Sequence, residues 1–370
     1  MKNNFGQSLY YASDKNIYDA LNRNRVTNET IQELFLARNI IVSRKTDRES
    51  LALYFSRLPH DLEDHKNIGA KLGIVARQER LTTTDVEIAA TAEDYNQAIT
   101  AVKNQVAKLN DTMTVSHHPD RIDLIIKYST IDFRKAEFSQ VQVRDGILSI
   151  IKSKTGYVIR STYNDYINDV RDSLVSEIEK HSGSQGVRNS ISLFAIPDAI
   201  KRSEFFHSLM YQMPDFRVKD VVEVYVYKQR PKSSDSKSNQ DDEKEESDSD
   251  THVERVLLRG SGVTRSKQLQ DLIRQNDKED PYYIVRVVWT VEQKLGLGHI
   301  YEIEARFEDA QDCTGFSYRL RGVYVADIKN RTGPSKSKRA STREEANHIG
   351  GVLEEHAKKL MDNLVAGVTN

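Results

Sequence analysis

Three consecutive stretches near the C-terminus alternate between apolar and polar residues, and this alternation constrains the fold more than any other feature of the sequence. The stretches are PYYIVRVVWTVE, HIYEIEARF and FSYRLRGVYVADI. Alternation with a period of two predicts β-strands that bury one face. Because short links join the stretches, we expect antiparallel pairing, with helices on one face of the sheet and solvent or a partner on the other.

The alternation assigns particular side chains to the buried face. They are Tyr283, Val285, Val287, Trp289 and Val291 in the first stretch, Tyr301, Ile303, Ala305 and Phe307 in the second, and Phe316, Tyr318, Leu320, Tyr324 and Ile328 in the third. On the other face, Glu304 can pair across strands with Arg319 or Arg321. A closing helix is predicted after Ser341, with Glu344 as its capping-box partner.

The remaining sequence predicts an α+β fold with three regions. A helical module is expected at 1–75, with one helix in TNETIQELFLA and another in TDRESLALYFSRL, which opens with a capping box of Thr46 and Glu49. A middle α+β region is expected at 80–185, and a C-terminal α+β domain with a mainly antiparallel sheet at 195–370. The sequence shows no internal repeat.

An acidic tract interrupts the C-terminal domain at 232–250. It holds eight acids against three lysines, a charge of −5, so the rest of the chain carries +4 of the total −1. Low hydrophobicity and charge repulsion predict a disordered loop between two paired strands, 221–230 and 253–260. We expect it to be inert or to compete with nucleic acid for a basic loop. The mildly basic remainder permits an anionic partner.

Several classes of protein are not expected. No stretch approaches the roughly 20 apolar residues that span a bilayer, and the N-terminus lacks the features of a signal peptide. The single cysteine, Cys313, allows no internal disulfide. These features predict a cytoplasmic protein without a membrane partner. Phosphate-binding loops, dinucleotide fingerprints, nucleophile elbows and zinc-ligand spacings are missing from the sequence, so no cofactor is expected.

Two basic segments are candidates for nucleic-acid binding. Arg44, Lys45 and Arg48 gather at the start of the second predicted helix, where the helix dipole favours phosphate. This helix, extended link and helix resembles the small DNA-binding modules of the SAP type, although the glycine common in their loops is missing here. The second segment is a flexible loop without acids. Its basic residues are Lys329, Arg331, Lys336, Lys338, Arg339 and Arg343.

An acid and a lysine close the third alternating stretch. Asp327 and Lys329 lie two residues apart, so a strand places them on one face. This pair resembles the (D/E)-x-K element of restriction-endonuclease-like nucleases, which implies a metal-dependent nuclease using Mg²⁺. The upstream acid is then Asp312 or Asp309, and a neighbouring strand offers Glu302 or Glu304.

Histidines and acids also gather in two short segments, HDLEDH at 60–65 and SHHPD at 116–120. In the first, His60 and Asp64 are four residues apart, as are Asp61 and His65, a spacing that can bind a metal on a helix face. Neither segment has a third well-spaced ligand group. We interpret both as solvated polar residues.

Together these features predict a non-catalytic protein that binds nucleic acid, with DNA the expected partner and RNA an open alternative, and that also docks a protein partner. By analogy, this layout suits an accessory subunit of a prokaryotic DNA-processing or antiviral defence system. Two alternatives stay open, the nuclease and a structural or regulatory subunit that binds no nucleic acid. A neutral or acidic sheet face would favour the last of these.

Overall fold

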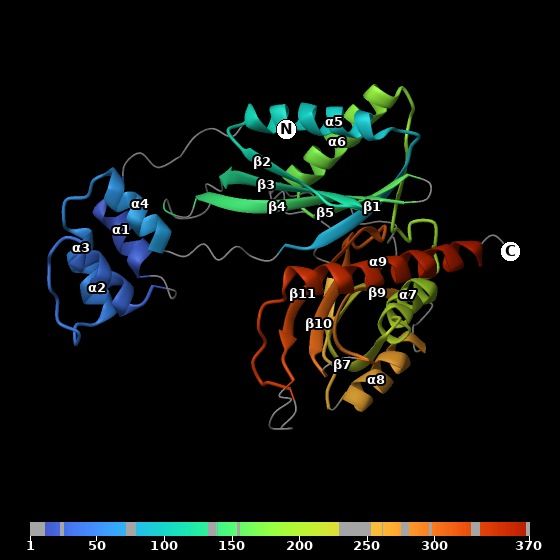
Figure 1. The fold of residues 1–370 in the computed structure, drawn as a ribbon. Coiled ribbons are helices and arrows are strands. Elements are labelled where there is room, and N and C mark those ends of the chain that lie inside the picture. Colours follow the sequence, from blue (N-terminus) through green and yellow to red (C-terminus); the bar gives the residue numbers. More distant parts are fainter. Residues whose placement is uncertain are drawn as a thin grey trace, which may run out of the picture. The chain divides into compact units, whose positions relative to one another are not determined.

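A computed structural model describes most of the chain. The described residues are 12–22, 26–71, 79–131, 138, 140–153, 156–228, 253–260, 262–274, 281–295, 298–326 and 334–367. Within them the chain forms nine helices and eleven strands, which confirms the expected α+β class (Figure 1). In these ranges no helix combines the length and apolar character that crossing a membrane requires.

The chain divides into two compact units. The first consists of Met1–Arg77, Ala89–Ile150 and Asp165–Ser184, and the second of Gln78–Ile88, Ile151–Asn164 and Gln185–Asn370. Strands β1 (Leu81–Glu87) and β5 (Tyr157–Thr162) therefore cluster with the C-terminal part of the chain. The acidic tract at 232–250 lies outside the described residues.

Four short helices form a bundle in the first unit (Figure 1). They are α1 (Asp14–Leu21), α2 (Asn28–Leu36), α3 (Arg48–Ser56) and α4 (Leu62–Lys71). Their buried side chains form one apolar cluster, and the two helices expected between 27 and 58 are confirmed. The capping box expected from Thr46 and Glu49 is wrong by one residue. Asp47 caps α3, because its carboxylate accepts a hydrogen bond from the Ser50 backbone N–H at 2.9 Å.

The rest of the first unit combines helices and strands. Its elements are α5 (Ala92–Ala107), β2 (Thr112–His117), β3 (Arg121–Ile131), most of β4 (Val141–Lys152) and α6 (Asp165–Ser182). The Tyr166 ring of α6 stacks on Tyr128 of β3 at 4.3 Å. A Cβ atom at Gly146 of β4 would lie 2.2 Å from Cδ1 of Ile167, so the close approach of α6 to β4 requires a glycine there.

The second unit contains an antiparallel sheet. Its strands neighbour one another in the order β5, β1, β11, β10, β9, β7 and β8, and β6 pairs with β1. The bounds are β6 (Val187–Ser190), β7 (Phe216–Lys228), β8 (Val253–Val256), β9 (Tyr282–Gln293), β10 (Ile300–Asp309) and β11 (Thr314–Tyr324). The pairing expected on either side of the acidic tract is confirmed, because Val224 to Tyr227 pair with Val256 to Val253.

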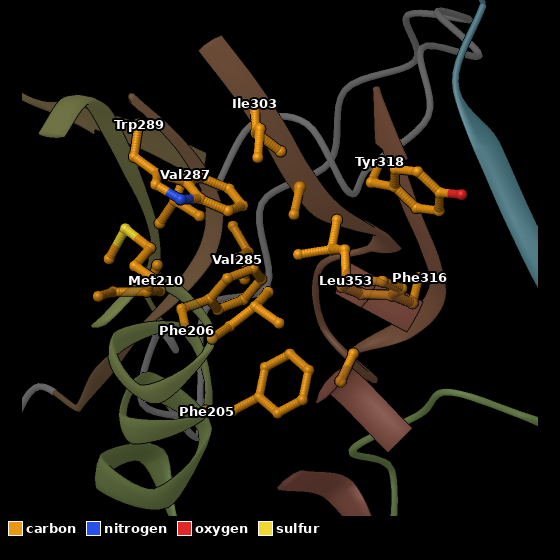
Figure 2. Close-up of a cluster of buried hydrophobic side chains, with 14 of the residues drawn as sticks. Phe205, Phe206, Met210, Val285, Val287, Trp289, Ile303, Phe316, Tyr318 and Leu353 are labelled. Carbon is orange, nitrogen blue, oxygen red and sulfur yellow. The ribbon is translucent and has the colours of Figure 1, made fainter. Parts of the chain in front are cut away.

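One face of this sheet is apolar and carries the helices α7 (Ala199–Tyr211), α8 (Gly262–Arg274) and α9 (Arg343–Ala366), whose side chains join its core cluster. Figure 2 shows side chains of α7, β9, β10, β11 and α9 meeting in that cluster. The labelled residues are Phe205, Phe206, Met210, Val285, Val287, Trp289, Ile303, Phe316, Tyr318 and Leu353. The buried faces expected for β9 and β10 are confirmed.

The expected alternation fails near the end of β11. Glu302 of β10 lies opposite Gly322, whereas the next residue, Ile303, lies opposite Leu320, so Arg321 is an extra residue in the ladder. This bulge moves Val323 onto the core face. Tyr324, expected in the core, instead donates a hydrogen bond to Oε2 of Glu302 at 3.1 Å, on the other face. Ile328 lies outside the described residues.

Helix α9 closes the second unit through polar contacts. Thr342 and Glu345 form its capping box, one residue after the expected Ser341 and Glu344. Buried Glu354 accepts hydrogen bonds from Arg160 of β5, at 2.8 and 2.6 Å, and from the Tyr318 hydroxyl of β11 at 2.6 Å. These contacts require close packing, because a Cβ atom at Gly350 would lie 2.5 Å from the Tyr318 hydroxyl.

The same order of elements occurs twice along the chain. The series β1-α5-β2-β3-β4-β5-α6 is followed by β6-α7-β7-β9-β10-β11-α9, with β8 and α8 inserted after β7. The first strands of the two series pair with each other, from Thr84 opposite Ser190 to Glu87 opposite Val187. The sequence shows no repeat, so the duplication lies in the order of the elements and not in the residue pattern.

Candidate nucleic-acid interface

Charged side chains cover the face of the second unit's sheet that lies opposite the core. Along β10, Glu302, Glu304, Arg306 and Glu308 alternate with the core residues. We define the charged face as four glutamates with their described ion-pair partners. The glutamates are Glu223, Glu302, Glu304 and Glu308, and the partners are Arg80, Arg255, Arg286, Arg306, Arg319, Arg321 and Lys338.

Glu304 is the most buried acid of this face, with no exposed side-chain area. Nε of Arg319, on β11, donates a hydrogen bond to Oε2 of Glu304 at 2.8 Å, and Nη2 lies 2.6 Å from the same oxygen. Arg321 lies 3.8 Å from that oxygen. The predicted pairing of Glu304 with these arginines is confirmed. A buried carboxylate needs such partners, because an unpaired charge is strongly destabilising in a protein interior.

Glu302 links the charged face to the segment before α9. Its Oε1 lies 2.8 Å from Nζ of Lys338 and 3.3 Å from Nε of Arg321. The backbone of Arg339 pairs with that of Val323 through two hydrogen bonds of 3.0 Å. The segment 334–340 is therefore held against the end of β11 by backbone and side-chain contacts together.

Glu308 organises the other end of the charged face. Its carboxylate accepts hydrogen bonds from Nε of Arg80 and from the hydroxyl of Ser317, both at 2.6 Å. Arg306 approaches the same carboxylate at 2.5 Å. Burial lowers the pKa of the Arg306 guanidinium, Glu308 opposes this effect, and the nearby charges of Arg80 and Arg286 lower the pKa further. Glu304 also opposes the decrease, so both acids and bases act on this guanidinium.

The strand register places several basic residues in one line across the sheet. Arg255 of β8 lies opposite Tyr225 of β7, Tyr225 opposite Arg286 of β9, Arg286 opposite Arg306 of β10, and Arg306 opposite Ser317 of β11. We call these five residues the arginine row. The guanidinium of Arg286 lies over the Tyr225 ring, 4.4 Å from its centroid. The acids that balance the row lie in other rows.

The described ion pairs leave the charged face with a positive excess. Seven basic side chains oppose four glutamates, so three positive charges are not balanced within this set. Arg286, Arg306, Arg319 and Arg321 each keep roughly a sixth to a quarter of their side-chain area exposed. These four side chains are therefore partly exposed to solvent.

The three basic residues predicted in the helical module lie at the start of α3. Arg44 and Lys45 are exposed in the turn before the helix, and Arg48 occupies its first turn, where Nη1 donates to the carbonyl of Val26 at 3.4 Å. The Asp47 carboxylate already occupies this helix end, and hydrogen bonds from Ser50 lower its pKa. The negative charge of Asp47 weakens the attraction of this helix end for phosphate.

The predicted basic loop is only partly described. Lys329 and Arg331 lie outside the described residues, Lys336 and Arg343 are exposed, and Lys338 belongs to the charged face. Nη1 and Nη2 of Arg339 donate hydrogen bonds to the two carboxylate oxygens of Glu345, at 2.8 and 2.6 Å. This interaction lowers the pKa of Glu345 to about 2. Of the described loop residues, the structure brings Lys338 alone into the charged face.

The residues predicted for a nuclease are not brought together in the described part of the chain. Asp312 lies in the turn before β11, and its backbone N–H donates to Asp309. Asp327 and Lys329 lie outside the described residues, and Ala326, directly before them, follows the opposite end of β11. At about 3.3 Å per residue, the 11-residue strand separates the two ends by roughly 35 Å.

The histidine segments take part in structural contacts. Arg38 pairs with Asp64 and contacts Nδ1 of His60 at 2.9 Å, while Nε2 of His60 lies 2.9 Å from the carbonyl of Phe55. In the second segment, His118 contacts buried Asp123 at 3.3 Å. No group of three or more potential metal ligands occurs among the residues that the structure describes.

The arginine row was not part of the sequence prediction, although its members are visible in the sequence. Alternation alone assigns Arg286 and Arg306 to the polar face, but it does not show which residues lie opposite each other. That information depends on the register of β9 and β10. No protein-family model matches this chain, and no curated protein matches it either.

Proposed function

We propose that this protein binds nucleic acid without cutting it, and that the charged face of the second unit makes the main contact. The positive excess of this face is the observation that carries the proposal. Arginine presents five N–H donors in a planar fork that matches phosphate oxygens. Its glutamate partners use some of these donors, and the remaining donors are available to a polyanion.

The ion pairs also hold the arginines in fixed positions. Arg286 is held between the Tyr225 ring and the carboxylates of Glu223 and Glu304. A side chain that is ordered before binding loses less conformational entropy when it contacts its ligand. Contacts of this kind add affinity and orientation without reading the base sequence. We therefore propose binding that depends on phosphates and tolerates different sequences.

The positive charge excess of the charged face also argues against a purely structural or regulatory subunit. For such a subunit we expected a neutral or acidic sheet face. The nuclease hypothesis gains no support, because Glu302 and Glu304 are engaged in ion pairs and Asp327 and Lys329 lie outside the described residues. The protein partner and the DNA-processing or antiviral context stay predictions from the sequence.

Titration of fluorescent oligonucleotides tests the proposal. Single- and double-stranded DNA and RNA of equal length are titrated with the full chain at about 50 and 200 mM salt. We expect an affinity that falls steeply with salt, because each neutralised phosphate releases counterions. Undetectable binding at low salt would refute the proposal. Incubation of plasmid DNA with Mg²⁺ or Mn²⁺ separates binding from cutting, and cutting would favour the nuclease.

A further inference from the structure

Two like-charged members of the arginine row lie opposite each other, and their repulsion opposes folding. Arg286 and Arg306 lie directly opposite each other on the paired strands β9 and β10. Side chains in such positions have Cβ atoms about 5 Å apart, and like charges there destabilise the sheet. Local conflicts of this kind within an otherwise consistent fold are expected at functional sites.

The neighbouring acids do not fully compensate this pair. Nε of Arg286 lies 3.1 Å from Oε1 of Glu304, but neither atom has a hydrogen-bond partner among the described residues, so the contact is not aligned for hydrogen bonding. Glu304 also serves Arg319 and Arg321. Arg306 shares the carboxylate of Glu308 with Arg80. Around the pair, basic groups outnumber acids.

We infer that Arg286 and Arg306 together bind one phosphate group of the nucleic acid, an inference that rests on the proposed function. Two guanidinium groups on adjacent strands can both donate hydrogen bonds to the oxygens of a phosphate bound between them. The anion then removes the repulsion that the pair experiences when the site is empty. Both side chains keep about a quarter of their area exposed, so the phosphate enters from solvent.

Arg306→Gln and Arg160→Gln form a matched pair of variants, because each removes one paired arginine and Arg160 lies outside the charged face. Arg306→Gln leaves Glu308 with Arg80 and Ser317, so we expect the chain to fold and its unfolding temperature without ligand to stay unchanged or rise. Arg160→Gln removes the two hydrogen bonds that Arg160 donates to buried Glu354 but leaves the Arg286–Arg306 pair intact. We expect it to lower the unfolding temperature and to leave phosphate binding in place.

The first measurement is the salt dependence of oligonucleotide binding. Loss of one phosphate contact lowers the slope of log K against log salt by about 0.7 for a single strand and about 0.9 for a duplex. We expect this change for Arg306→Gln and an unchanged slope for Arg160→Gln. An unchanged slope for Arg306→Gln, or an equal loss in both variants, would overturn the phosphate site.

The second measurement uses inorganic pyrophosphate, with sodium chloride at equal ionic strength as the control. We expect pyrophosphate to raise the unfolding temperature of the unmodified chain and of Arg160→Gln, but not that of Arg306→Gln. If this pattern occurs without oligonucleotide binding, the site stands and the proposed function fails. If the chain binds oligonucleotides and the Arg306→Gln slope is unchanged, the proposed function stands and the site fails.

Discussion

The two faces of the sheet in the second unit are built from the same strands but are stabilised differently. On the core face, β9, β10 and β11 contribute apolar side chains that pack with those of α7 and α9 (Figure 2), and α8 adds Leu269 and Ile273 to the same cluster. On the charged face, alternate residues of the same strands form ion pairs with more bases than acids. Burial therefore determines the first face, whereas ion pairing between particular residues determines the second.

Phe206→Ala is the strongest test of the core face. Phe206 is fully buried and makes edge-on contacts with Phe205 at 5.4 Å and Phe307 at 5.6 Å. Removing a buried phenylalanine ring lowers the free energy of unfolding by about 3–5 kcal/mol. Urea denaturation measures this loss. The control is Phe194→Ala, because Phe194 is 66% exposed, and a comparable loss there would contradict burial as the cause.

Glu304→Gln tests the charged face in the same assay. The substitution keeps the size of the side chain but leaves Arg319, Arg286 and Arg321 without their shared carboxylate. We expect a loss of about 2–3 kcal/mol, less than for a fully buried pair because the arginines are partly exposed. The control is Glu254→Gln, because Glu254 forms an exposed ion pair with Lys228. We expect it to change the free energy of unfolding by less than about 0.5 kcal/mol.

Gly350 and Gly351 of α9 form a natural pair of test positions. Alanine normally stabilises a helix by about 1 kcal/mol relative to glycine. At Gly350 the new methyl group would meet the Tyr318 hydroxyl and disturb its bond to Glu354, so we expect a net loss of about 1–2 kcal/mol.

At Gly351 a new methyl carbon would lie 3.6 Å from its nearest neighbour, Nη2 of Arg160, which is an ordinary contact distance. We therefore expect Gly351→Ala to raise the unfolding temperature while Gly350→Ala lowers it. If both variants shift the unfolding temperature in the same direction, Gly350 is not required for the close packing of Tyr318.

The smallest expected effect concerns the helical module. Replacing Arg44, Lys45 and Arg48 together by alanine should weaken oligonucleotide binding by only a few-fold, because Asp47 occupies the same helix end. The titration at low salt measures this change beside Arg306→Gln. A larger loss in the triple variant would move the main contact from the charged face to the SAP-like module. Unchanged binding would exclude the module from the interface.

Alternation predicted β9, β10 and most of β11 with their buried faces, and capping residues predicted the starts of α3 and α9 to within one residue. The shift from Thr46 to Asp47 and from Ser341 to Thr342 arose because neighbouring residues of both pairs can cap a helix. The bulge that turned Tyr324 away from the core escaped prediction, since it depends on the β10–β11 register. Lys338 was predicted to bind nucleic acid, but its ion pair with Glu302 was not predicted.

The sequence by itself determined the α+β class, the faces of β9 and β10 and the basic balance of the chain outside the acidic tract, because hydrophobic period and charge are local properties. Apart from the pairing of Glu304 with Arg319 and Arg321, the tertiary structure alone decided which charges meet. The repeated order of elements, the Arg160–Glu354–Tyr318 contacts under α9 and the opposition of Arg286 and Arg306 all join residues that are distant in the chain. Strand register and helix packing bring such residues together. Both depend on how side chains from the whole chain pack in the core.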